Sequence, residues 1–136
     1  MENNMTEKLI NVLGKAQQIA LEHSSQVIDI PHIIKALYDD EDSMLKNILE
    51  KCDSNPKAFD EFVNDSINSI YKSNNVSPTN MYFSNDASKL FNDASKYRKE
   101  LSDTYLSTEH IILALFDSKH WLVSKLQGIN TFVIFI

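Results

Sequence analysis

Histidine, cysteine and a short acidic run are the side chains of this sequence that could do chemistry. His32 and His110 occupy equivalent places in two nearly identical segments, HIIKALYD (32–39) and HIILALFD (110–117). A repeated histidine could bind a metal ion or transfer protons. Each of the two, however, stands in an apolar segment just inside a predicted helix start. We therefore interpret both as packed or helix-capping residues.

The other candidate residues support no catalytic or metal site. Cys52 is the single cysteine and has no neighbouring base, so we expect a buried or idle thiol. Gly14-Lys15 lacks the second glycine of a phosphate-binding loop. The acidic run at 39–42 could bind a cation, but it lacks the spacing and glycine of a calcium loop, so we predict a solvated loop. The sequence thus predicts a protein that is not an enzyme, with no cofactor and no bound metal.

Composition indicates a single domain of helices. Of the 136 residues, 43% are hydrophobic and 24% are charged, which is typical of a globular domain. With two glycines and three prolines, we expect helices joined by short polar loops. A net charge of −6 disfavours nucleic-acid binding, and no apolar run has the length of a membrane span. The lone cysteine and the absence of a signal-peptide pattern predict a cytoplasmic location.

The two histidine segments belong to a longer internal repeat. They lie 78 residues apart (110 − 32), and six of their eight positions are identical. At the same offset Thr6 falls on Ser84, and apolar positions fall on apolar positions. Chance apolar spacing does not readily keep caps and apolar positions in one register. We therefore predict one domain of two related halves, repeat one at 6–71 and repeat two at 84–136, joined by a linker at 72–83.

Caps and apolar spacing predict the first two helices of each half. Thr6 and Ser84 are good N-cap residues, and apolar side chains then recur at every third and fourth position, which indicates a helix with one buried stripe. The stripes contain Leu9, Val12, Leu13, Ala16, Ile19 and Ala20 in the first half, and Ala87, Leu90, Phe91, Ala94 and Tyr97 in the second. Asp29 and Ser107 are placed to cap the helices that carry the histidine segments.

After the first two helices, the predictions for the two halves differ. The loops before the histidine segments contain Val27-Ile28 and Tyr105-Leu106, two pairs that we expect to be buried. Third helices are expected near 44–49 and 121–126, and a fourth at about 56–71 in the first half. The second half ends instead in NTFVIFI, which we expect to fold back or to pair. The predicted fold is all-α, with the last helix of the second repeat truncated or altered.

These segments resemble a known family. Two copies of a helix, a short loop and the pattern H-I/L-I/L-x-A-L are similar to the double Clp-N motif, found in the amino-terminal domain of Clp AAA+ unfoldases. The matching segments are MTEKLINVLGKAQQIA with IDIPHIIKALYDDED, and ASKLFNDASKYRKE with YLSTEHIILALFDSKH. The likeness covers residues 5 to 130. It implies an eight-helix domain built from two pseudo-twofold-related four-helix repeats.

The resemblance also implies a function and a set of site residues. Clp amino-terminal domains engage unfolded or aggregated polypeptides, or adaptor proteins, and present them to an ATPase ring. ClpC-type domains carry an acidic residue before both histidines, whereas here Pro31 stands at the first place and Glu109 at the second. The ClpB type is therefore favoured over the ClpC and ClpA types. It implies substrate contacts at Thr6, Asp103 and Glu109, for which local capping and loop bracing are the alternative.

A pseudo-twofold helical domain also has a seam where its two first helices meet. Apolar side chains partly exposed at this seam would form a groove for apolar segments of unfolded chains, with low sequence specificity. The candidate groove residues are Leu9, Leu13, Leu90 and Phe91, and the alternative is that they belong to the core. Two functions remain open: a substrate-binding module of an unfoldase, or a stand-alone scaffold or adaptor that docks another protein or a Clp ring.

Overall fold

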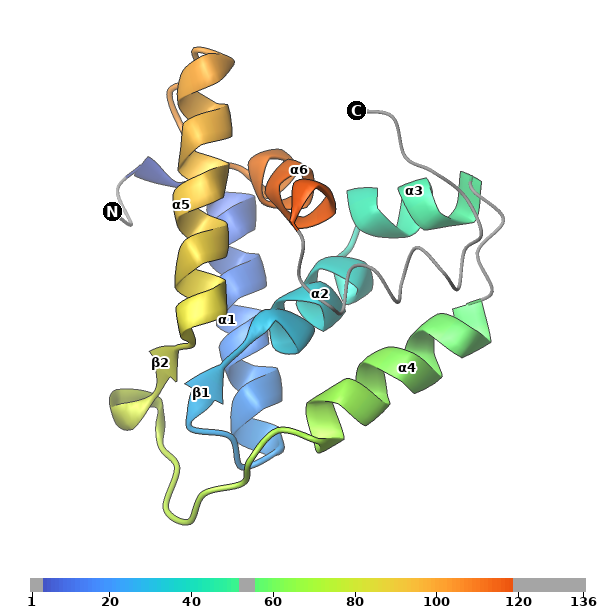
Figure 1. Cartoon of the computed structure of the whole chain (residues 1–136), viewed down its shortest axis with the longest axis vertical. Helices are drawn as coiled ribbons and strands as arrows, with labels where there is room; N and C mark the ends of the chain where they lie inside the picture. Colours follow the sequence, from blue (N-terminus) through green and yellow to red (C-terminus); the bar gives the residue numbers. More distant parts are fainter. Residues whose placement is uncertain (1–3, 52–55, 119–136) are drawn as a thin grey trace.

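The computed structural model describes residues 4–51 and 56–118 of the chain (Figure 1). Helices dominate this part, as predicted, and the only sheet within it is one pair of two-residue strands. In chain order the elements are α1 (Glu7–Glu22), β1 (Val27–Ile28), α2 (Ile30–Asp39), α3 (Met44–Lys51), α4 (Pro56–Asn68), the 3-10 helix η2 (Pro78–Asn80), β2 (Tyr82–Phe83), α5 (Asn85–Glu100) and α6 (Thr108–Asp117). The third helix predicted near 121–126 and the apolar tail lie outside the described residues.

The predicted caps start the helices. The Leu9 amide donates to Thr6 Oγ1 over 3.2 Å at the start of α1, and the Ala87 amide donates to Ser84 Oγ over 3.0 Å at the start of α5. Asp29 caps α2, where its carboxylate accepts from the Ile30 amide over 2.8 Å. Each cap satisfies an amide that has no partner within its own helix.

The histidine segment is repeated because it forms the central helix of each repeat. α2 packs against α1, α3 and α4, and α6 packs against α5. Most of α2 and α6 is therefore buried, including both histidines. Burial leaves few positions free to vary in polarity, and this accounts for five of the six shared residues; the sixth is the exposed aspartate that ends each helix, Asp39 and Asp117.

The ends of α1 and α5 repeat the same backbone geometry. Ser24 and Ser102, 78 residues apart (102 − 24), have φ angles of 57° and 58°. The Ser25 amide donates to Ala20 O over 2.9 Å, and the Asp103 amide donates to Arg98 O over 3.0 Å. Both helices thus end in a left-handed residue followed by a bond back to the last turn. This conformation usually falls to glycine, so composition alone did not indicate it.

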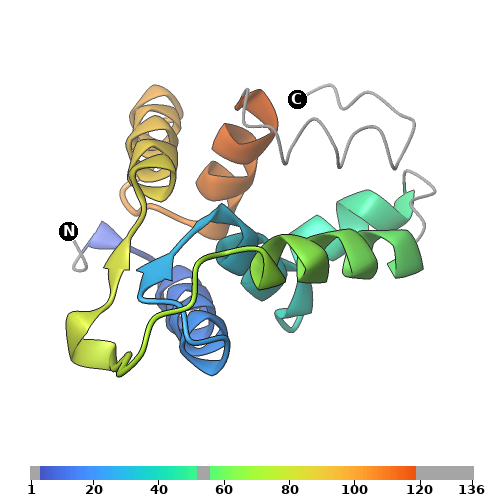
Figure 2. The ribbon, with the colours of Figure 1, turned by 60° about the horizontal axis from the view of Figure 1, so that its bottom comes forward.

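Two parallel backbone pairings join the repeats, and each is the twofold counterpart of the other. The Ser84 amide donates to Ile28 O over 3.0 Å beside the β1–β2 pair. At the same offset, the Thr6 amide donates to Leu106 O over 2.9 Å beside the Met5–Leu106 bridge. Figure 2 shows the paired strands between α1 and the start of α5. The chain just before each first helix therefore pairs with the chain before the second helix of the other repeat.

Two local expectations need correction. Tyr105 was expected to be buried with Leu106, but it is 51% exposed, because only Leu106 faces the bridge to Met5. The predicted linker at 72–83 has no helical period, yet it contains η2 and β2. Ser77 and Pro78 begin the 3-10 turn, and β2 gains its order from pairing with β1. The repeat boundaries themselves stay a prediction.

Candidate functional site

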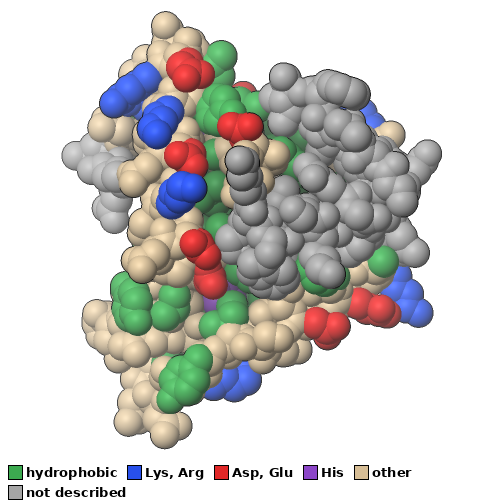
Figure 3. Space-filling view, viewed as in Figure 1, with side chains coloured by type: hydrophobic (Ala, Val, Ile, Leu, Met, Phe, Trp, Pro, Cys, Tyr) green, Lys and Arg blue, Asp and Glu red, His purple; other side chains and the backbone are tan. Residues whose placement is uncertain are grey.

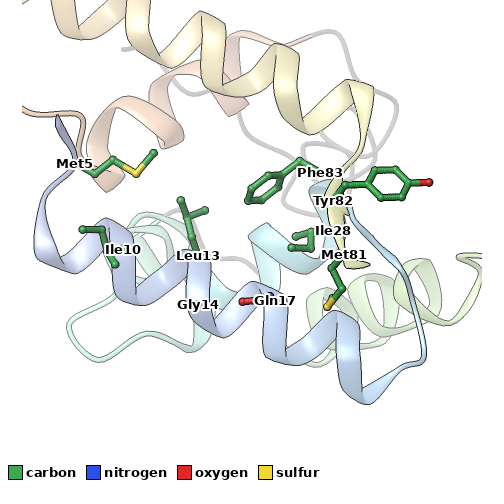
Figure 4. A pocket seen from close by; sticks show the side chains of 9 residues that line it. All are labelled: Met5, Ile10, Leu13, Gly14, Gln17, Ile28, Met81, Tyr82 and Phe83. Atoms are coloured by element: carbon green, nitrogen blue, oxygen red, sulfur yellow. The ribbon is translucent and has the colours of Figure 1, made fainter. Parts of the chain in front are cut away.

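An apolar groove of about 520 Å³ lies between α1 and the chain around β2. Nine residues line it: Met5, Ile10, Leu13, Gly14, Gln17, Ile28, Met81, Tyr82 and Phe83. Figure 4 shows α1 on one side of this space, the residues of β2 at one end and α5 across from α1. The groove therefore has α1 as one wall and the chain just before α5 as another, and no residue of α5 itself is among its lining residues.

Two stripes of α1 side chains face different surroundings. Leu9, Val12, Ala16, Ile19 and Ala20 are buried and form the core stripe. One position further along, Ile10, Leu13, Gly14 and Gln17 follow the same three-and-four spacing and line the groove. Ile10 is 45% exposed, and a Cβ added at Gly14 would meet no atom within 4 Å. The second stripe thus leaves open apolar surface on the groove wall.

The β2 end of the groove is fixed by an aromatic contact with α5 and by two side-chain hydrogen bonds to the 3-10 helix η2. The ring of Phe83 lies edge-on against that of Phe91 in α5, with 5.0 Å between the ring centroids. Gln17 Nε2 donates to Pro78 O over 3.4 Å, and Gln26 Nε2 donates to Asn80 O over 3.1 Å. Tyr82 is 56% exposed, and Figure 3 shows apolar side chains at the surface in the region of β2.

None of the nine described residues that line the groove carries a charge. The two lysines of α1 contact residues on another side of the helix. Lys8 Nζ lies 3.4 Å from Asp40 Oδ2, and Lys15 Nζ donates to Asp39 O over 3.1 Å. The lysines of α1 are thus directed at the acidic loop after α2. That loop was predicted to be solvated, and it is partly engaged in these contacts.

The two histidines cap helices, as predicted. The Asp29 amide donates to His32 Nδ1 and the Ser107 amide donates to His110 Nδ1, each over 2.9 Å. Their other nitrogens differ: His110 Nε2 lies 2.7 Å from Asp103 Oδ2, whereas His32 Nε2 is buried and has no hydrogen-bond partner among the described residues. Burial lowers the pKa of His32 from 6.5 to about 4. The charge of Asp29 acts in the opposite direction and raises this pKa, whereas His23 lowers it further.

The structure places the seven predicted site residues in three settings. Leu13 lines the groove. Leu9, Leu90 and Phe91 are buried in the core, which corresponds to the alternative interpretation of these positions, and the Phe91 ring packs against Phe83 of the groove wall. Any contribution of these three to binding would be indirect.

The remaining three site residues come together at one corner. Thr6 caps α1 and pairs through its amide with Leu106, Asp103 contacts His110, and the exposed Glu109 precedes His110 in the first turn of α6. Thr6 and Asp103 therefore have the bracing contacts expected of structural residues. A role of this corner in substrate binding stays a prediction.

Sequence reasoning missed Ile10 and the segment 81–83 as parts of the groove. Ile10 was detectable as an apolar residue left over from the core stripe of α1. The segment 81–83 gave no such signal, because its place in the groove depends on pairing with β1, more than fifty residues earlier in the chain.

The described part of the chain has neither a metal-binding cluster nor a membrane-spanning helix. Among residues 4–51 and 56–118, no group of three or more His, Cys, Asp or Glu side chains could hold a metal ion. No helix of the described part is long and apolar enough to cross a membrane.

These features define an all-α domain of two twofold-related repeats, with an uncharged apolar groove between α1 and the chain around β2. The chain matches the Clp repeat (R) N-terminal domain family over residues 4–127, and it belongs to that family. The predicted resemblance is thereby confirmed.

Curated relatives agree with the predicted ClpB type. The chain is 28% identical over 137 residues to the chaperone protein ClpB of Staphylococcus aureus (strain COL), an alignment covering 96% of this chain and 16% of that protein. It is 36% identical over 118 residues to ClpB of Lactococcus lactis subsp. cremoris (strain MG1363), covering 85% of this chain and 13% of that protein. The chain thus spans a small part of the length of these relatives.

Solved structures share the fold. The Hsp104 N-terminal domain from Candida albicans matches with a TM-score of 0.80 and 19% identity, over 94% of this chain and 82% of that one. The N-terminal domain of the chaperone ClpD from Arabidopsis thaliana matches with a TM-score of 0.68 and 18% identity, over 94% of this chain and 87% of that one. At these identities the likeness supports the fold alone.

Proposed function

We propose that this domain binds unfolded or aggregated polypeptides through the groove between α1 and β2, as a non-catalytic substrate-binding domain of a ClpB-type chaperone. The observation that carries the proposal is the second stripe of α1, where Ile10 and Leu13 stay partly exposed beside Gly14. Covering such a surface with apolar side chains removes it from water, which lowers the free energy of the system.

The groove favours low sequence specificity. Its described lining has apolar side chains and no charge, so it attracts segments by desolvation and dispersion rather than by paired charges. It is also open to solvent along α1, as the exposure of Ile10 shows. We expect dissociation constants roughly in the micromolar range or weaker for a permanently unfolded chain. Adaptor proteins and an ATPase ring are further proposed partners, and the proposed location is the cytoplasm.

The mid-helix glycine makes a direct test possible. Gly14→Trp would project an indole into the groove, where an added Cβ meets no atom within 4 Å. We expect it to weaken binding of reduced, carboxymethylated lactalbumin, a permanently unfolded protein, by about tenfold or more. Gly14→Ala is the matched control, because it fills almost none of the groove and favours the helix by roughly 0.5 to 1 kcal/mol. Fluorescence anisotropy would measure binding, and thermal melting would report folding.

A second pair of variants tests the polarity of the groove. Ile10→Ser should weaken binding, whereas Leu101→Ser, at an exposed leucine after α5 that is not among the lining residues, should leave it unchanged. Equal binding by Gly14→Trp, Ile10→Ser and the unaltered protein, all folded, would contradict the proposal. Binding of a folded partner but of no unfolded chain would favour the adaptor function instead.

A further inference from the structure

Two methionines belong to the groove wall. Met5 precedes α1 and Met81 precedes β2, and both are partly buried against the core. Figure 4 shows both thioether side chains at the groove, on either side of the α1 residues that line it. A third described methionine, Met44, begins α3, is 40% exposed and does not line the groove. The chain therefore offers two groove methionines and a matched one elsewhere.

The chemistry of these two side chains sets the polarity of the groove. A thioether is apolar and polarisable, and it packs well against varied apolar partners. A sulfoxide at the same place carries a strongly polar oxygen that accepts hydrogen bonds from water. An apolar segment that covers this oxygen removes the water and offers no donor in return, which is unfavourable. Among the nine lining residues, only Gln17 and Tyr82 have side-chain donors, and the Gln17 amide already donates to Pro78.

We propose that Met5 and Met81 are oxidation sites through which a hydroperoxide turns off polypeptide binding, an inference that rests on the proposed function of the groove. A sulfur lone pair attacks the terminal oxygen of the hydroperoxide and forms the S–O bond, while the O–O bond breaks. The sulfur loses two electrons, and the proton and the remaining oxygen leave as water or an alcohol. Reduction of the sulfoxide by thiols, with release of water and formation of a disulfide, restores the thioether.

The experiment uses the full chain treated with dilute hydrogen peroxide. Peptide mapping by mass spectrometry follows the sulfoxide at each methionine, and anisotropy follows the affinity for carboxymethylated lactalbumin. We expect oxidation of Met5 and Met81 to weaken binding roughly tenfold, as burial of an unpaired polar group implies, and sulfoxide reductases to restore it. For the double variant Met5→Leu/Met81→Leu the affinity is compared before and after treatment, and we expect the two values to be equal, whatever the starting affinity of this variant is. Met44→Leu should lose affinity as the unaltered chain does.

The outcomes separate this inference from the proposed function. If the untreated protein does not bind the unfolded chain, the proposed function fails. If it binds, the inference is overturned by any of three results: unchanged affinity with both sulfoxides present, no sulfoxide at either position, or equal loss in the double leucine variant. Circular dichroism at 222 nm completes the test, since a loss of affinity that parallels a loss of helicity would also overturn it.

Discussion

His32 and His110 hold equivalent positions, but within residues 4–51 and 56–118 only His110 has a partner for its second ring nitrogen. Nδ1 of each accepts the amide of its N-cap residue, so in the neutral form the proton sits on Nε2. In His110 that proton faces Asp103, whereas His32 Nε2 is buried and meets no acceptor in the part of the chain that the structure describes. The same helix cap is thus built from a histidine with a partner in one repeat and from one without it in the other.

This difference predicts a pH dependence that comes from His32. Burial lowers its pKa from 6.5 to about 4 in the folded state, so the unfolded chain takes up this proton first as the pH falls. The contribution of neutral His32 to stability is therefore complete above pH 6.5 and is lost progressively as the pH falls toward about 4. Between pH 7 and pH 5 we expect a loss of roughly 2 kcal/mol in the free energy of unfolding from this group.

The variant His32→Gln tests this expectation. Glutamine suits the third position of a helix and can accept the Asp29 amide without titrating. Urea unfolding at pH 7 and pH 5 should show a clearly smaller loss of stability in His32→Gln than in the unaltered protein. Equal losses in the two proteins would show that His32 is not the titrating group.

Asp103 has two possible roles, and the structure makes them separable. Its carboxylate is the acceptor for the buried His110 Nε2, but the Asp103 side chain is itself 49% exposed, which weakens the contact through solvent screening. We expect Asp103→Ala to lower the free energy of unfolding by about 1 kcal/mol, and Glu109→Ala by less than about 0.5 kcal/mol. Urea unfolding would measure both. If Asp103→Ala weakened polypeptide binding without changing stability, the bracing role would be wrong.

At the scale of the element, α1 shows which features the sequence could predict. Thr6 and the core stripe were identified from residue type and spacing, because a cap and a buried face are local properties of a helix. Of the groove stripe, Leu13 was identified and Ile10 was missed, because Gly14 and Gln17 interrupt the apolar character of the stripe. Its other wall depends on β2, which the sequence could not place beside α1 without knowledge of the β1 pairing. Local periodicity thus predicted the helices, and tertiary pairing made the groove.

The helix ends also carry strain that the sequence did not indicate. Ser24 and Ser102 adopt left-handed φ angles of 57° and 58°, a conformation that costs a residue with a Cβ roughly 1 kcal/mol or more. We expect Ser24→Gly and Ser102→Gly each to raise the free energy of unfolding by roughly 0.5 to 1 kcal/mol. Ser95→Gly, within α5, is the control and should lower it by a similar amount. Thermal unfolding would measure all three, and a destabilising Ser102→Gly would contradict the expectation.

At the scale of the whole molecule, one carboxylate ties the two repeats together. Asp29 Oδ1 accepts the Ile30 amide over 2.8 Å and the Ser84 hydroxyl over 2.7 Å, while Ser84 Oγ accepts the Ala87 amide over 3.0 Å. The caps of α2 and α5 therefore form one connected network, next to the β1–β2 pairing. At the twofold-related place the residues are Ser107 and Thr6, and neither of them carries a carboxylate. The junction of α2 with α5 is thus chemically distinct from that of α6 with α1.

A double-mutant cycle on Asp29 and Ser84 measures this coupling between repeats. Asp29→Ala and Ser84→Ala should each lower the free energy of unfolding by about 1 to 2 kcal/mol, because each removes a helix cap. Either single substitution already removes the hydrogen bond between the two side chains. The double variant should therefore lose less free energy of unfolding than the sum of the two single losses, by roughly 0.5 to 1.5 kcal/mol.

The control cycle pairs Asp29→Ala with Thr6→Ala, two caps with no hydrogen bond between their side chains in the described structure, and should be additive within about 0.5 kcal/mol. Urea unfolding of all variants at pH 7 provides the free energies. Additivity in both cycles would mean that the Asp29–Ser84 bond adds nothing to the stability of the joined repeats, which would then rest on the backbone pairings and on the shared hydrophobic core.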